Sequence, residues 1–158
     1  MRIIILFISV IIFISCEEKV VQVEFDQKTF IEQRQLWQES NIKNYQYQFS
    51  VFGNPSYHGT IFVENRTFKY DSPLDEYSDI ANFIEYSTID DIYNTIENTF
   101  NLYNNTKQSI HDAYYSKIIV EYDKINNIPI SISYRYTAPP DVWLDGPFDY
   151  EITNFGSK

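Results

Sequence analysis

Three kinds of side chain in this sequence could do chemistry: a single cysteine, two histidines and several loop carboxylates. His58 and His111 could join carboxylates in a metal site, but their positions match no ligand spacing of a metal motif. The sequence contains no phosphate-binding loop, no dinucleotide fingerprint and no serine-hydrolase or zinc-protease motif. We therefore expect no metal site, no cofactor and no catalytic residue.

Three of the carboxylates, Asp141, Asp145 and Asp149, recur around the prolines of "PPDVWLDGPFD". Oxygen-rich loops can bind Ca²⁺. Four-residue spacing would gather these acids only on a helix, however, and the prolines and Gly146 prevent one. We interpret them as solvated loop acids. Trp143, in the same loop, either packs onto the domain or stays exposed as a contact residue.

The only cysteine, Cys16, follows an apolar run from Ile3 to Ile14, with Arg2 before it. As a helix this run would be about 18 Å long, too short for a hydrocarbon core of about 30 Å. Its length is typical of a signal peptide. The ending "FISC" resembles a bacterial lipobox, whose cysteine is acylated and becomes the first residue after cleavage. The alternative is an uncleaved N-terminal anchor with an incidental thiol.

The lipobox resemblance implies three parts of the chain. Residues 1–15 would be the signal peptide, residues 16–25 the acylated Cys16 with a short tether, and residues 26–158 a single domain. Two or three acyl chains hold a protein stably on a membrane, where one chain is marginal. A lone cysteine cannot form an intramolecular disulfide, so no competing role is evident. We expect a bacterial cell-envelope protein on the periplasmic or surface face of a membrane.

The composition favours one β-rich domain and excludes nucleic acid as a partner. The 158 residues include 22 acids against 12 lysines and arginines, for a net charge of −10. An acidic surface repels phosphates. Aromatic residues make up 18% of the chain, with 14 Tyr and 12 Phe, which favour half-buried strands. This content indicates either ordinary β-structure, the interpretation we favour, or a Tyr-rich binding face.

The first segment with helical periodicity lies close to the N-terminus. Phe30, Arg34 and Trp37 fall on one face of a helix predicted over residues 27–39, with Asp26 as its N-cap. Arg34 lies one turn before Trp37. Its guanidinium could stack on the indole ring or pair with a carboxylate. The alternative is that Arg34 is simply a surface residue.

A second helix is predicted to begin after Thr88 and to end at Asn104. Thr88 and Asp91 form an approximate capping box. The apolar stripe of this helix has three- and four-residue spacing and comprises Ile89, Ile92, Tyr93, Ile96, Phe100 and Tyr103. The preceding stretch, residues 71–86, is acidic and aperiodic and is predicted to be a loop.

The remaining segments alternate between apolar and polar residues, which predicts half-buried strands. In "YQYQFSV", Tyr45, Tyr47 and Phe49 share one face. A tight turn is predicted at residues 64–66. Local hairpins imply an antiparallel sheet of about five to six strands with two helices on one face. The predicted fold class is an α+β two-layer sandwich with the order α-β-β(-β)-α-β-β-β.

Several of these stretches resemble an uncharacterised family of small bacterial lipoproteins, a domain of unknown function. They are the Arg34-x-x-Trp37 helix, the strand "NYQY", the helix opening "TID", the strands in "VEYDKINNIPISISYRY" and the ending "DGPFDYEITNF". The resemblance covers residues 30–155 and implies one lipid-anchored domain. It implies no activity, because none is established for the family.

The sequence favours a lipid-anchored, non-catalytic binding domain in the cell envelope. The membrane would hold its lipid, and its partner would be an envelope protein, a peptide or a glycan. The candidate binding residues are Arg34, Trp37, Tyr134, Tyr136 and Trp143. One alternative is an envelope hydrolase that pairs carboxylates from among Asp71, Asp75, Glu76, Asp141 and Asp145. Another is an inhibitor or assembly factor.

Overall fold

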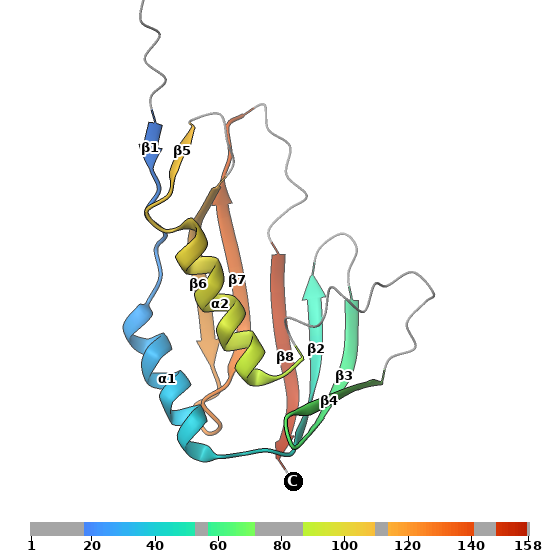
Figure 1. The fold of residues 1–158 in the computed structure, drawn as a ribbon. Helices are drawn as coiled ribbons and strands as arrows, with labels where there is room; N and C mark the ends of the chain where they lie inside the picture. Colours follow the sequence, from blue (N-terminus) through green and yellow to red (C-terminus); the bar gives the residue numbers. More distant parts are fainter. Residues whose placement is uncertain (1–17, 53–56, 72–86, 110–113, 141–147, 158) are drawn as a thin grey trace, which may run out of the picture.

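The computed structural model describes residues 18–52, 57–71, 87–109, 114–140 and 148–157. These residues form two helices, a two-stranded sheet and a six-stranded antiparallel sheet (Figure 1). The helices are α1 (Gln27–Ser40) and α2 (Ile89–Tyr103). The strands are β1 (Glu18–Val20), β2 (Tyr45–Phe52), β3 (Tyr57–Glu64), β4 (Thr67–Asp71), β5 (Lys107–Ser109), β6 (Tyr114–Tyr122), β7 (Pro129–Thr137) and β8 (Phe148–Ser157). The predicted α+β class, with two helices and an antiparallel sheet, is confirmed.

The six-stranded sheet consists of two three-stranded meanders that meet at its centre. β2, β3 and β4 form one meander and β6, β7 and β8 the other, so that the order across the sheet is β4-β3-β2-β8-β7-β6. The central pair joins β2 to the C-terminal strand β8, with Phe49 opposite Ile152. The register of this pair shifts between Gln46 and Gln48. Asn154, at the shift, has a positive φ of 51°, the left-handed conformation that occurs in one class of β-bulge.

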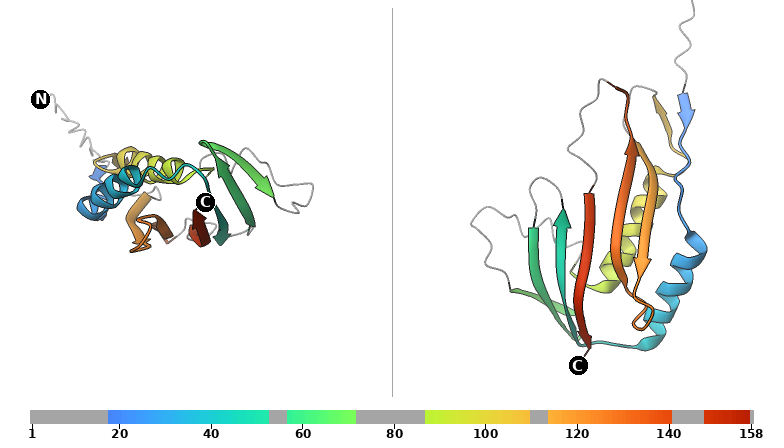
Figure 2. Two further views of the ribbon diagram at one scale, coloured as in Figure 1. Left: turned by 90° about the horizontal axis from the view of Figure 1, so that it is seen from below. Right: turned by 180° about the vertical axis from the view of Figure 1, so that it is seen from behind.

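Both helices lie on the same side of the sheet (Figure 2). They run in opposite directions, so the end of α1 and the start of α2 lie at the same end of the molecule (Figure 1). The start of β2 and the β3–β4 turn also lie there, and we call this the turn end. β1 and β5 lie at the opposite end, the β1–β5 end.

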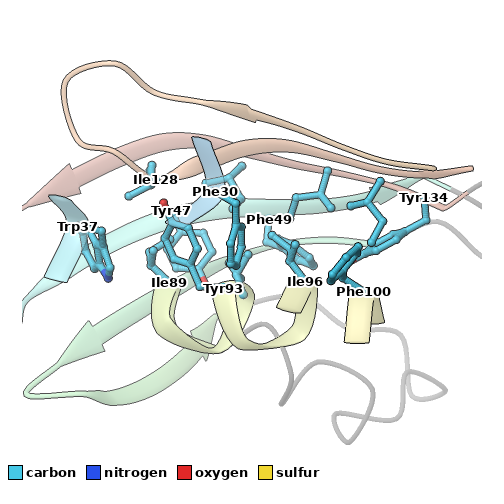
Figure 3. Packing of buried hydrophobic residues seen from close by; sticks show 14 of the residues in the cluster. Phe30, Trp37, Tyr47, Phe49, Ile89, Tyr93, Ile96, Phe100, Ile128 and Tyr134 are labelled. Atoms are coloured by element: carbon cyan, nitrogen blue, oxygen red, sulfur yellow. The ribbon is translucent and has the colours of Figure 1, made fainter. Parts of the chain in front are cut away.

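Aromatic side chains fill the space between the helices and the sheet (Figure 3). The alternation of β2 is as predicted, since Tyr45, Tyr47 and Phe49 are buried while Gln48 is exposed. The helices contribute Phe30, Trp37, Ile89, Ile92, Tyr93, Ile96 and Phe100 to the same core. Most of the aromatic residues that the structure describes therefore belong to the core or pack against it, in agreement with the favoured interpretation of the composition.

Both helices begin at the predicted capping residues. Asp26 accepts a hydrogen bond from the Thr29 amide at 3.0 Å, and this bond lowers the pKa of the Asp26 carboxyl. Thr88 Oγ1 accepts from the Asp91 amide at 3.0 Å and donates to Asp91 Oδ2 at 2.6 Å. α1 ends where Asn41 adopts a left-handed φ of 53°. The predicted helices are confirmed, with α1 one residue longer than expected.

The β3–β4 turn is a two-residue hairpin at Asn65 and Arg66, within the turn that the sequence predicts. Glu64 pairs with Thr67, and the two turn residues have positive φ values of 50° and 68°. Positive φ at both central residues is typical of a type I′ turn, whose twist suits the flanking strands. Asparagine tolerates this conformation, whereas a residue such as arginine adopts it at a cost of about 1–2 kcal/mol.

The segment predicted to be a tether belongs to the fold from Glu18 onward. β1 pairs antiparallel with β5. Val21 and Val23 are buried, and the Val21 amide donates to the Thr106 carbonyl at 2.9 Å. This corrects the predicted boundary of the domain at residue 26. Strands of three residues are too short to show an alternating pattern, so their pairing was not visible in the sequence.

Candidate functional site

A cavity of about 490 Å³ opens at the turn end of the molecule, and we call it the end cavity. Its lining comes from the end of α1, the α1–β2 connection, the start of β2, the β3–β4 turn and the start of α2. It includes Trp37, Lys43, Tyr45, Arg66, Asp90 and Asp91. Its volume lies in the usual range of small-molecule sites, about 300–1,000 Å³. Segments far apart in the sequence thus build one concave surface.

The charged side chains of the end cavity do not neutralise one another. Lys43, Arg66, Asp90 and Asp91 all line it. No ion pair joins any two of them among the residues that the structure describes. The carboxylate of Asp91 instead accepts a hydrogen bond from Thr88. Two cations and two carboxylates therefore face the same cavity without direct contact between opposite charges.

Tyr45 connects the sheet to the start of α2 at the wall of the end cavity. Its hydroxyl accepts a hydrogen bond from the Ile89 amide at 3.0 Å, and both residues are buried. This amide lies in the first turn of α2, where backbone N–H groups have no partner within the helix. Burial raises the pKa of Tyr45 to about 12, with smaller contributions from the nearby carboxylates of Asp90 and Asp91.

Replacing Tyr45 with phenylalanine is expected to lower the free energy of unfolding by about 1–3 kcal/mol, because the buried Ile89 amide loses its acceptor. Tyr103→Phe is the matched control, since the Tyr103 hydroxyl makes no hydrogen bond within the described residues. Its expected cost is within about 0.5 kcal/mol. Urea unfolding of both variants measures the difference. Equal costs would show that the Tyr45–Ile89 bond does not stabilise α2.

Arg34 joins α1 to α2. Its Nη1 donates to Glu97 Oε2 at 2.8 Å, and its Nη2 donates to Asn94 Oδ1. The sequence left open whether Arg34 stacks on Trp37, pairs with a carboxylate or is simply a surface residue, and the structure shows the pairing with a carboxylate. Arg34 is therefore committed to a contact between the helices.

Replacing Arg34 with methionine keeps the apolar stem but removes this contact. We expect a loss of about 1 kcal/mol, the upper end of the range for partly exposed pairs. The control is Lys117→Met, which breaks the ion pair of Lys117 with Glu24. That pair has side-chain exposures of 42% and 72%, against 24% and 46% for Arg34 and Glu97. We expect it to contribute less than about 0.5 kcal/mol. Chemical denaturation that ranks the two variants the other way would contradict this account.

The other residues predicted to form a binding surface do not lie together on the surface. Trp37 and Tyr134 are only 3% and 4% exposed. This corrects the expectation for both, because the inner faces of α1 and β7 direct them into the core. Tyr136 is half-buried, with its ring 6.2 Å from that of Tyr115, and Trp143 lies outside the described residues.

The exposed large apolar residues do not form a tyrosine-rich face that could serve as the binding surface instead. Of the exposed large apolar residues in the described ranges, only Phe52 and Phe68 are aromatic. Three tyrosines of the sheet, Tyr45, Tyr47 and Tyr134, are buried in the core instead. These three are therefore not part of the Tyr-rich binding face considered from the composition.

The remaining candidate residues form no second site in the part of the chain that the structure describes. There, no group of three or more His, Cys, Asp or Glu residues could hold a metal ion. His58 lies in β3. Asp149 is a strand residue, whose Oδ1 accepts from Arg135 Nη1 at 2.6 Å, and this bond lowers its pKa. The candidates outside the described residues are Cys16, Asp75, Glu76, His111, Asp141 and Asp145. Of the loop predicted over residues 71–86, only Asp71 is described, and it is the last residue of β4.

The chain matches no protein-family model, no curated protein and no solved structure. Neither helix in the described ranges is long and apolar enough to cross a bilayer.

The cation and acid positions of the end cavity were not predicted from the sequence. Asp90 was recognisable as a residue in the first turn of α2, and Arg66 as part of a turn. That these two segments lie beside Lys43 follows from the strand order and from the direction of the helices. No local pattern in the sequence carries that information.

Proposed function

We propose that this protein is a lipid-anchored protein of the bacterial cell envelope whose single domain binds a partner at the end cavity and is not catalytic. The anchor would be Cys16, acylated after removal of residues 1–15. The lipobox-like "FISC" ending supports this proposal, and membership of the uncharacterised lipoprotein family stays a prediction. The partner would be an envelope protein, a peptide or a glycan that inserts a small group into the cavity.

The position of the end cavity relative to the N-terminus carries this proposal. Glu18, the first residue of β1, follows Cys16 by two positions in the sequence. β1 lies at the end of the molecule opposite to the cavity (Figure 1). Because Val21 and Val23 are buried, the domain begins almost directly after the cysteine. An anchor at Cys16 would therefore hold the β1–β5 end at the bilayer and present the end cavity away from it.

We further infer a two-layer sandwich whose helices and six-stranded sheet follow the predicted order of elements. β1 and β5 are two short strands that this predicted order does not include. Phe30 of α1 packs edge-on against Tyr93 of α2 at 5.5 Å, and Arg34 binds Glu97. These contacts support a single helical layer over the sheet. Such a layer keeps the end of α1 beside the start of α2, which is the arrangement that the end cavity needs.

The orientation on the membrane can be measured by NMR. The full chain, acylated in a bacterial host, would be placed in nanodiscs that contain a lipid with a paramagnetic headgroup. We expect strong broadening of the backbone amides of Val20 and Lys107 and little broadening of those of Arg66 and Asp90. A matched sample with the diamagnetic lipid is the control. Equal broadening at both ends, or stronger broadening at Arg66, would overturn the proposed orientation.

A further inference from the structure

The end cavity has the charge pattern of a site for a ligand that itself carries both signs. Lys43 and Arg66 come from the α1–β2 connection and the β3–β4 turn, and Asp90 comes from the first turn of α2. A lone anion would be attracted by the two cations but repelled by Asp90 and Asp91, and a lone cation would meet the reverse. A molecule with a separate ammonium and carboxylate satisfies both sets of charges.

Three of the four charged groups are available to such a ligand. Among the described residues, the side chains of Lys43, Arg66 and Asp90 make no hydrogen bond or ion pair. Asp91 is held by Thr88, and the Tyr45 hydroxyl is occupied by the Ile89 amide. A ligand can therefore bind two cations, Lys43 and Arg66, and one carboxylate, Asp90, that are free within the described part of the chain.

We propose that the end cavity binds a short peptide with a free amino terminus and a free carboxyl terminus. The carboxylate would be held by Lys43 and Arg66, since a guanidinium can bind it through two hydrogen bonds. The ammonium would be held by Asp90. This inference rests on the proposed function, because it names the class of ligand for the same cavity.

The separation of the charges favours a peptide over a free amino acid. In an amino acid both charges are attached to one carbon atom, whereas in a dipeptide a peptide bond lies between them. The cations and Asp90 come from different elements and make no direct contact, which suits the larger separation. Ile42, which is half-buried, supplies apolar contact for the body of the ligand, and about 490 Å³ is ample for a dipeptide.

The test is an NMR titration of the full chain in detergent micelles with L-Ala-L-Ala. Three further probes separate the contributions of the two terminal charges to binding. N-acetyl-Ala-Ala has only the carboxylate, Ala-Ala amide has only the ammonium, and free alanine has both charges close together. We expect shifts of cavity amides and a Kd of about 1 mM or tighter for Ala-Ala, with each other probe at least about tenfold weaker.

Two variants assign the charges, and one serves as control. Arg66→Asn keeps a residue that tolerates positive φ, so the turn is retained while the cation is lost. It should weaken Ala-Ala about tenfold and leave Ala-Ala amide unaffected. Asp90→Asn should weaken Ala-Ala by a similar factor and leave N-acetyl-Ala-Ala no weaker. Lys28→Gln removes an exposed charge at the far end of α1 and should change nothing.

Two outcomes would overturn the proposed ligand class. One is the absence of cavity shifts at about 10 mM Ala-Ala, a concentration that detects even weak binding. The other is equal binding of Ala-Ala and its capped forms. Either result would leave the anchor and its orientation standing, because those are measured in the nanodisc experiment without any peptide. Conversely, if the nanodisc experiment contradicts the proposed orientation while Ala-Ala still binds, only the membrane role is rejected.

Discussion

Replacement of Trp37 by alanine is expected to lower the free energy of unfolding by about 3–5 kcal/mol, the range for large aromatic residues in a core. Trp37 is 3% exposed and connects three elements. Its ring lies edge-on to Tyr45 at 5.4 Å and to Phe155 at 6.1 Å. A cavity here would loosen α1 from both central strands. Since small domains have a total stability of about 5–15 kcal/mol, the variant should lose a substantial part of it.

The neighbouring residue provides the control. Leu36 is 41% exposed on the same helix, so Leu36→Ala should cost about 0.5 kcal/mol or less. Trp37→Phe keeps an aromatic ring in the core and should be intermediate. Thermal and urea unfolding, followed by circular dichroism, would rank the three variants. If Trp37→Ala costs no more than Leu36→Ala, the placement of α1 against the sheet is wrong.

The protein is expected to unfold in alkaline solution as its buried tyrosines ionise. Burial is the main cause of a raised pKa for Tyr45, Tyr47, Tyr93, Tyr115 and Tyr122. A tyrosine whose pKa is higher in the folded state favours folding fully below its unfolded value of 10, and this contribution is lost as the pH rises through the folded value. For Tyr45, with a folded pKa of about 12, the loss reaches about 3 kcal/mol across this window.

Tyrosinate absorbance and circular dichroism measured in one titration would test this expectation. The buried tyrosines should ionise together with the loss of structure between about pH 10 and 12. The Tyr45→Phe variant gives a sharper check. Its stability deficit relative to the wild type should shrink across the same window, because the variant lacks one of the titrating groups. A deficit that stays constant from pH 9 to 12 would contradict the assigned pKa of Tyr45.

The helices and main strands could be predicted because their determinants are local. Asp26 and Thr88 cap their helices through residues three positions away. The buried stripe of α2 follows directly from apolar spacing. In β2 the alternation distinguishes Tyr47, which is fully buried, from Gln48, which is exposed. Such short-range patterns are reliable here because the tertiary packing buries the same residues that the local pattern places on the apolar face.

The features that could not be predicted depend on contacts between distant segments. β1 is stabilised by β5, about ninety positions later in the chain, and neither strand has a pattern of its own. The role of Arg34 depended on Glu97, a residue of the other helix. Tyr134 was placed on a surface because aromatic residues suit binding sites, but the pairing of β7 with β6 and β8 turns it into the core. The end cavity needed five elements to meet, so no single stretch indicated it.

The central proposal is a domain that is held at a membrane through Cys16 and whose end cavity is directed away from the bilayer. Intact mass of the protein extracted from bacterial membranes, wild type beside Cys16→Ala, tests this most directly. We expect a chain that begins at Cys16 and carries two or three acyl chains, with no such species in the variant. An unmodified chain that retains Met1 in the wild type would contradict it.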